Sequence, residues 1–239
     1  MIVDIFIPCF VDQLYPQTGF NMVKVLERVG CDVNYNPEQT CCGQPAFNAG
    51  YWADAKKVGE KFIKEFQHDR YIVSPSASCV GMIKNYYPEM FHNSALHNEY
   101  KQLAKNIHEF SDFLVNVLKV SDIGATLEGT ATYHDSCAAL RECNIKQEPR
   151  ALLSKVRMLE LKEMKDTESC CGFGGTFSAK FEPIAVGMVS DKVKNAVETG
   201  AQYLISTDLS CLLHMDGYIK KQNLNVKTMH LADVLASGW

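Results

Sequence analysis

The sequence predicts an α/β protein built as a tandem of two similar halves, related by a pseudo-twofold axis, each with a parallel sheet. Three observations carry this prediction. Eight of the ten cysteines recur in register along the chain. Short apolar segments alternate with amphipathic helical segments, as in parallel sheets covered by helices. The 239 residues suffice for two small domains. We therefore expect one repeat over residues 1–122 and a second over residues 123–239.

The cysteine register is the clearest sign of a duplication. Laid on each other, the halves align Cys9 with Cys137, Cys41 and Cys42 with Cys170 and Cys171, and Cys79 with Cys211. The flanking segments agree as well: YIVSPSASC matches YLISTDLSC, and EFSDFLVNVL matches HLADVLASG. Only Cys31 and Cys143 lack a counterpart, so the other cysteines mark equivalent positions.

The elements of the first half follow from local patterns. The apolar segment IVDIFIPC predicts a strand that ends at Cys9. Apolar residues then recur at helical spacing, and Gly30 supplies a stop signal. We expect, in order, a strand at 2–9, a helix at 19–30, a strand at 31–43, a helix at 52–66, and a strand at 70–79 that opens a helix through residue 83.

The second half repeats this pattern. We expect a strand at 130–137, a helix at 149–158, a strand within 159–170, a helix at 183–200, a strand at 201–211 and a helix at 212–221. In open parallel sheets, ligands bind beyond the carboxyl ends of the strands. The repeated cysteines lie at those ends, so the four thiols of one half are expected to converge although they are far apart in sequence.

Bulk properties exclude several classes of function. The net charge of −4 gives no reason to expect a nucleic acid or an anionic membrane as partner. The N-terminal segment contains Asp4 and no basic region, so it predicts a buried strand rather than a signal peptide. No run of apolar residues is long enough to span a bilayer. We expect a cytoplasmic protein without a direct membrane span.

Four converging thiolates are typical of metal or redox chemistry in a cytosolic chain. An iron–sulfur cluster is the first candidate, because cysteine thiolates hold such clusters. Adjacent cysteines can both bind only if the backbone turns sharply, and Gly43 and Gly172 permit such a turn. Tetrahedral zinc is a second candidate, although no C-x-x-C knuckle is present. A thiol–disulfide device is a third, although vicinal cysteines form disulfides with difficulty.

The repeated pattern of a single cysteine, a Cys-Cys-Gly and a further single cysteine resembles the CCG cysteine-rich domain. That domain occurs in tandem in the B subunit of heterodisulfide reductase and in the iron–sulfur subunits of glycolate oxidase and anaerobic glycerol-3-phosphate dehydrogenase. The segments IPCFVDQLYPQTG, CCGQPAFNAGY, SPSASCVGMI, YHDSCAALREC and CCGFGGTFSAKF are most similar to the cysteine-rich component of three-part, flavin-independent L-lactate oxidation systems.

This resemblance implies an iron–sulfur electron-transfer component with one cluster, of the [4Fe–4S] kind, in each copy. It implies two partner subunits, one of them a ferredoxin-like iron–sulfur protein, and a non-catalytic or co-catalytic role in an L-lactate dehydrogenase complex. The implied ligands are Cys9, Cys41, Cys42, Cys79, Cys137, Cys170, Cys171 and Cys211. A thiol–disulfide reductase of the heterodisulfide reductase type and a zinc-stabilised scaffold remain alternatives.

The chain departs from the fullest CCG pattern at the fifth thiol. Met82 and His214 stand where a C-x-x-C pair would end. His214 is a candidate nitrogen ligand or a surface histidine, and Met82 is expected to fill the core because a thioether is a weak ligand.

Five further residues are candidates for site or structural roles. His134 and Asp135 precede Cys137 at a strand end, where they either orient a ligand, pass protons or have structural partners. Cys143 is a minor candidate for approaching the second site, and Cys31 is expected to begin a buried strand. Arg141 is expected to be a solvated helix residue.

Overall fold

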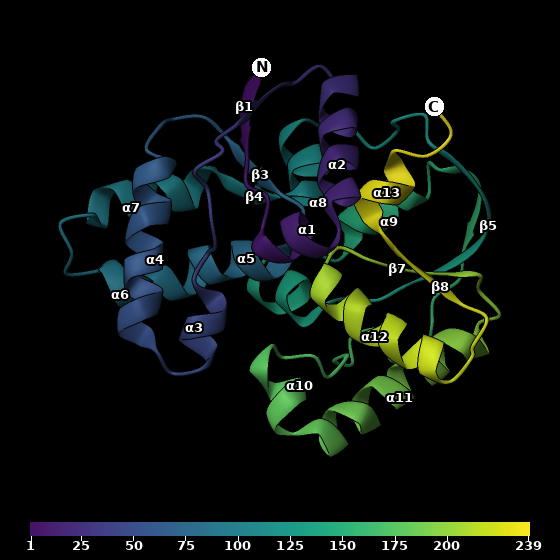
Figure 1. The fold of residues 1–239 in the computed structure, drawn as a ribbon. Helices are drawn as coiled ribbons and strands as arrows, with labels where there is room; N and C mark the ends of the chain where they lie inside the picture. The colour runs from purple at the N-terminus through teal and green to yellow at the C-terminus, as the bar shows by residue number, and fades with distance from the viewer.

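The computed structural model describes all residues, 1–239, and contains two four-stranded sheets (Figure 1). The first has the order β2-β1-β3-β4 and the second the order β6-β5-β7-β8. Every neighbouring pair is parallel. The strands are β1 (Ile2–Ile5), β2 (Asp32–Tyr35), β3 (Ile72–Ser74), β4 (Ile107–Glu109), β5 (Thr126–Tyr133), β6 (Arg157–Leu161), β7 (Tyr203–Ser206) and β8 (Lys227–His230). The repeated order confirms the predicted α/β tandem.

Each sheet reverses its strand order beside its first strand. In the first half, β1 pairs with β2 on one side and with β3 on the other. In the second half, β5 pairs with β6 and β7 in the same way. Such a reversal opens a crevice beyond the carboxyl ends of the two inner strands, and ligands of open α/β sheets bind there. Each half therefore offers one such crevice.

Helices cover both sheets. Those of the first half are α1 (Cys9–Leu14), α2 (Pro16–Arg28), α3 (Gln44–Asn48), α4 (Trp52–Glu65), α5 (Ala77–Gly81), α6 (Tyr87–Phe91), α7 (His97–Asn106) and α8 (Phe110–Asp112). Those of the second half are α9 (Gln147–Leu153), α10 (Thr176–Lys180), α11 (Glu182–Glu198), α12 (Leu209–Lys221) and α13 (Leu231–Leu235). Three π-helical turns span Met82–Tyr86, Phe113–Val117 and Ala138–Glu142.

The two halves share one hydrophobic core. A cluster of 22 buried residues includes Val25 and Phe110 from the first half and Tyr133, Leu152 and Leu231 from the second. Helix α2 packs against α13, and α9 packs against α8; Figure 1 shows these four helices gathered between the two sheets. Since α2 and α9 follow the first strands and α13 and α8 follow the fourth strands, the two contacts are pseudosymmetric equivalents.

A separate core supports the outer side of each half. In the first half, α4, α6 and α7 enclose a cluster that contains Phe6, Phe62 and Tyr87. In the second half, α11 and α12 enclose a cluster that contains Val193 and Met215. None of the helices combines the length and the apolar character that crossing a bilayer requires.

The prediction of a helix at 149–158 is wrong in its second part. Helix α9 ends at Leu153, and the Ser154 hydroxyl donates to the carbonyl of Ala151 at 2.8 Å. The Arg157 amide then donates to the carbonyl of Ala125 at 3.0 Å, which starts the pairing of β6 with β5. Pairing with a distant strand therefore overrides the local helical pattern.

Several elements were not predicted. The fourth strands, β4 and β8, complete the two sheets, and the short helices α3 and α10 follow the Cys-Cys-Gly segments. Helix α7 has no equivalent in the second half, whereas α5, the π-helical turn Met82–Tyr86 and α6 together correspond to α12. Cys31 is buried in the shared core, as expected, but β2 after it is a mostly exposed edge strand rather than a buried one.

Candidate metal centre

The eight repeated cysteines line a single cavity of about 470 Å³ between the two halves. Contrary to the prediction, the strands do not reach the cysteines: β1 ends at Ile5 and Cys9 is the first residue of α1, and β3 ends at Ser74 and Cys79 lies in α5. Their equivalents after β5 and β7 are Cys137 and Cys211. The adjacent pairs, Cys41 with Cys42 and Cys170 with Cys171, follow β2 and β6. The switch point of each sheet thus brings its four thiols together, and the shared core brings the two sets to one cavity.

Both Cys-Cys-Gly turns have the same geometry. Gly43 and Gly172 have φ angles of 86° and 84°, which glycine adopts without strain. A Cβ on Gly43 would lie 3.0 Å from the carbonyl oxygen of Ala55, and one on Gly172 would lie 2.8 Å from that of Ala185. Two constraints therefore require glycine here, the left-handed backbone and its close approach to α4 or α11.

The glycine amides point at sulfur. The amide of Gly43 donates to Cys41 Sγ and that of Gly172 to Cys170 Sγ, both at 3.4 Å. In the first half, Cys9 Sγ lies 3.9 Å from Cys41 Sγ. Hydrogen bonds from the Cys42 and Cys9 thiols and from the backbone amides of Gly43 and Cys42 hold the pKa of Cys41 well below its usual range. Hydrogen bonds from the Cys137 and Cys171 thiols and the Gly172 amide do the same for the pKa of Cys170.

The neighbouring thiols show the opposite shift. The pKa values of Cys9 and Cys42 are raised by their hydrogen bonds to the Cys41 sulfur and by burial. Those of Cys137 and Cys171 are raised for the same reasons around Cys170. Because like charges at such distances repel, four thiolates can coexist in one half only beside a multivalent cation. The donor set is therefore suited to a metal ion or an iron–sulfur cluster, both of which bind thiolates.

Polar groups also line the cavity, and sequence reasoning missed them. Asp208 is buried, and burial raises its pKa. Its carboxylate accepts hydrogen bonds from the Ser78 amide at 3.1 Å and the Ser210 hydroxyl at 2.8 Å. Glu142 also lines the cavity, and burial raises its pKa too. The alignment of the two halves could have pointed to Asp208, because it places this acid opposite Ser76 of the first half, a difference within an otherwise similar segment.

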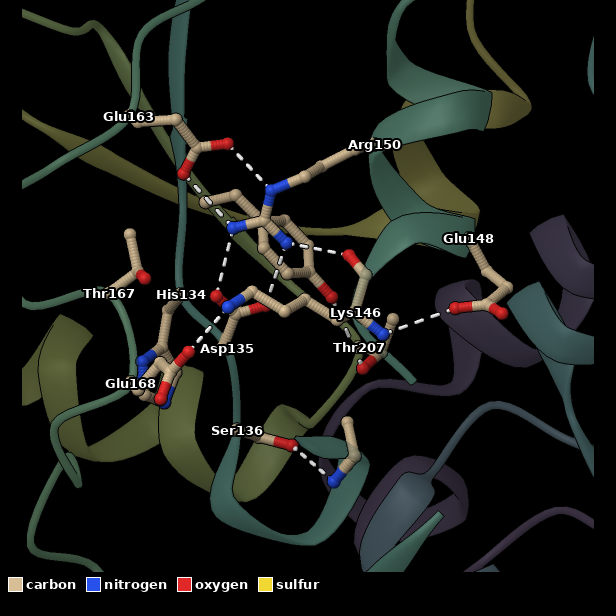
Figure 2. A network of polar contacts seen from close by, with 12 residues as sticks. His134, Asp135, Ser136, Lys146, Glu148, Arg150, Glu163, Thr167, Glu168 and Thr207 are labelled. Atoms are coloured by element: carbon tan, nitrogen blue, oxygen red, sulfur yellow. Dashed lines mark hydrogen bonds and ion pairs between the residues drawn. The ribbon is translucent and has the colours of Figure 1, made fainter. Parts of the chain in front are cut away.

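Asp135 has a structural partner. Its carboxylate accepts two hydrogen bonds from the Arg150 guanidinium, both at 2.8 Å, and Arg150 also binds Glu163 at 2.6 and 3.0 Å (Figure 2). The Asp135 side chain is 1% exposed. This network fixes the end of β5 just ahead of Cys137, so the acid positions the cysteine segment and is not itself in the cavity lining.

His134 is fully buried beside the second cysteine set, where it contacts the cysteine side of the site without lining the cavity itself. One of its ring nitrogens and the Sγ atoms of Cys171 and Cys211 lie within 4.8 Å of one another. Neither ring nitrogen has a hydrogen-bond partner. Burial and the nearby Lys192 lower the pKa of His134 to about 3, so the imidazole is neutral.

The remaining candidates lie elsewhere. His214 Nε2 faces the carbonyl of Ala185 at 3.4 Å, and the residue does not line the cavity. Cys143 packs against the first half, where its thiol lies 3.5 Å from the carbonyl of Ala77, and burial raises its pKa to about 12. Met82 is fully buried in the core beside Cys79, as predicted, and Arg141 is exposed, as predicted.

Comparison with known proteins identifies the family of the repeated domain. The family model described as "Cysteine-rich domain" (CCG) matches residues 3–84 and 131–216. The chain is 46% identical to lactate utilization protein A of Halalkalibacterium halodurans, over 98% of this chain and 96% of that one. It is 44% identical to lactate utilization protein A of Bacillus subtilis, over 99% and 100%.

A solved structure shares the fold. It is described as a hypothetical protein from Helicobacter pylori and matches with a TM-score of 0.61 at 12% identity, over 98% of this chain and 48% of that one. At this identity the match concerns the fold alone. The two matched repeats and the full-length relatives show that the chain belongs to the CCG cysteine-rich domain family, beside the lactate utilization A proteins.

Proposed function

We propose that the protein is an iron–sulfur electron-transfer component of an L-lactate oxidation system, with one cluster held by the four cysteines of each half. The observation that carries the proposal is the convergence of all eight thiols on one cavity, beside two sheet switch points. The names of the full-length relatives add the link to lactate utilization.

The chain's own groups suit this role. A cluster supplies one-electron transfer when bound, and its potential depends on hydrogen bonds to sulfur and on solvent exposure. The amides of Gly43 and Gly172 donate to sulfur in both halves, and Cys42, Cys79, Cys171 and Cys211 are buried. Because both sets line one cavity, electrons would cross between the halves without an intermediate carrier. The substrate would be oxidised, and the electrons accepted, with the help of two partner subunits, one a ferredoxin-like protein.

Anaerobic purification followed by iron, sulfide and zinc analysis tests the proposal. We expect about four irons and four sulfides per half, as in a [4Fe–4S] cluster, and an EPR signal after reduction. Cys41→Ser should remove the iron and sulfide of the first half, and Cys170→Ser should remove those of the second half. Cys31→Ala is the matched control, because Cys31 is buried in the core and does not line the cavity. Zinc without sulfide would contradict the proposal and support a scaffold.

A thiol–disulfide reductase is the second candidate. It is favoured by the exposed Cys9, whose sulfur lies 3.9 Å from Cys41, the thiol with the lowered pKa in this half. This candidate requires a chain without iron that reduces a small disulfide, and it requires that Cys41→Ser abolish the reaction.

A further inference from the structure

The two cysteine sets differ at one buried position. The His134 amide donates to the carbonyl of Ile205 at 2.8 Å, and the Phe6 amide donates to the carbonyl of Val73 at 3.0 Å. Each bond links the end of the first strand to the third strand of its sheet, and each residue lies at the same distance ahead of Cys137 or Cys9. His134 in the second half is therefore the structural equivalent of Phe6 in the first.

The partners of these two residues differ as well. Ala55 and Ala185 occupy equivalent places, since each touches the glycine of its Cys-Cys-Gly turn. Phe62 follows Ala55 in α4 at the same spacing as Lys192 follows Ala185 in α11, so Phe62 and Lys192 are equivalent positions too. In the first half, Phe6 packs edge-on against Phe62 with a centroid distance of 4.7 Å. The second half has replaced this aromatic pair by an imidazole and an ammonium group, both fully buried.

The ammonium group is satisfied and the imidazole is not. Lys192 Nζ donates to the carbonyls of Asp166 at 2.9 Å and Thr167 at 2.6 Å. His134 has no hydrogen-bond partner on either nitrogen. A buried polar group without a partner destabilises the fold, so its presence calls for a function or a missing partner. The groups that face it from α12 and from the Cys-Cys-Gly turn are the sulfurs of Cys211 and Cys171.

We propose that His134 contributes a nitrogen ligand to the metal centre of the second half, beside Cys171 and Cys211. The first half then holds its centre by thiolates alone, and the second half by a mixed imidazole–thiolate set. Neutral imidazole and thiolate are both ordinary ligands of iron and zinc. This inference rests on the proposed function, because it presumes a metal centre in each half.

A nitrogen ligand has a readout that does not depend on activity. We would purify the full chain anaerobically as the Cys41→Ser variant, in which only the second half is expected to hold a metal centre. One sample would contain ordinary histidine and the other ¹⁵N-labelled histidine. Pulsed EPR of the reduced sample should show a strong nitrogen hyperfine coupling that changes with the label. The coupling should disappear in His134→Phe and persist in His214→Gln, the control histidine, whose Nε2 faces the carbonyl of Ala185 rather than the cysteine sulfurs.

The outcomes separate the two claims. Iron and sulfide with only the weak coupling of nearby amides would overturn the role of His134 and leave the proposed function intact. A chain without iron would overturn both. Should His134→Phe fold poorly, the double variant His134→Phe with Lys192→Phe recreates the aromatic pair of the first half. The comparison of labelled and unlabelled samples that retain His134 also tests for the nitrogen ligand without any change at this position.

Discussion

The carboxylate of Asp208, from the second half, accepts a hydrogen bond from the backbone amide of Ser78, from the first half, at 3.1 Å inside the shared cavity. Asp208 is 2% exposed, and the Ser78 hydroxyl lies 3.4 Å from the same carboxylate. The two cysteine sets are therefore joined by a polar contact next to the cysteines as well as by the hydrophobic core.

Removing this contact should destabilise the protein. Asp208→Ala leaves the Ser78 amide without an acceptor, and we expect the free energy of unfolding to fall by about 1–3 kcal/mol. Urea denaturation at matched metal content measures the change. In Ser78→Ala the amide keeps its acceptor, so the loss should be smaller. Equal losses in the two variants would show that the amide contact is unimportant.

The two glycine turns should be equally intolerant of substitution. Gly43→Ala and Gly172→Ala combine a left-handed backbone with a Cβ placed 3.0 or 2.8 Å from a carbonyl oxygen. We expect each to cost more than about 1 kcal/mol and to reduce metal content in its own half only. Gly50→Ala is the control, since Gly50 has φ 88° but nothing within 4 Å of a Cβ. The prediction fails if all three variants lose the same stability and keep full metal content.

The effects of substituting Arg150 and Asp135, which form a buried ion pair, on stability should be strongly coupled. Arg150→Met leaves the buried Asp135 carboxylate without its partner, which typically costs about 3–5 kcal/mol. Arg150→Met with Asp135→Asn should recover much of this loss, because no uncompensated charge is left in the interior. Thermal denaturation of the two single variants and the double variant measures the coupling. Additive losses would mean that the two side chains act independently.

Glu109 should make stability depend on pH. This carboxylate caps α8 by accepting the amides of Ser111 and Asp112 at 2.8 and 3.2 Å, and its burial raises its pKa to about 8. The native state then binds a proton more tightly than the unfolded chain. Its contribution to stability is complete below the unfolded pKa of 4.5 and is lost as the pH rises towards 8.

A neutral amide should remove that dependence. Glu109→Gln imitates the protonated carboxyl, so the unfolding free energy of this variant should be flatter between pH 5 and 8, by about 1.4 kcal/mol per unit of pKa shift removed. Denaturation midpoints across this range test it, with Glu128→Gln on the exposed part of β5 as the control. Parallel pH curves for Glu109→Gln and the unmodified protein would contradict it.

The sequence predicted the repeat and the convergence within each half, because cysteines at strand ends must meet where parallel strands end. It did not predict that both sets share a cavity. That relationship depends on the packing of α2 against α13 and of α9 against α8, contacts between residues far apart in sequence. The division at residues 122 and 123 stays a prediction.

Single side chains were harder to place than the cysteines. His214 follows Cys211 closely in sequence, yet the turn of α12 directs it towards Ala185. Cys143 belongs to the second half but packs on α5 of the first, because the π-helical turn Ala138–Glu142 lies against α5. Such placements depend on helix phase and on contacts between halves, which spacing alone does not reveal.

The contacts of α2 with α13 and of α9 with α8 are copies of each other, as they would be in a dimer of two identical chains. In a homodimer each substitution appears on both sides of the axis, so neither centre can change alone. Covalent linkage of the copies removes that restriction. Phe6 opposite His134, and Ser76 opposite Asp208, are differences that a symmetric homodimer could not accumulate, and they give one protein two unlike cysteine sets around one cavity.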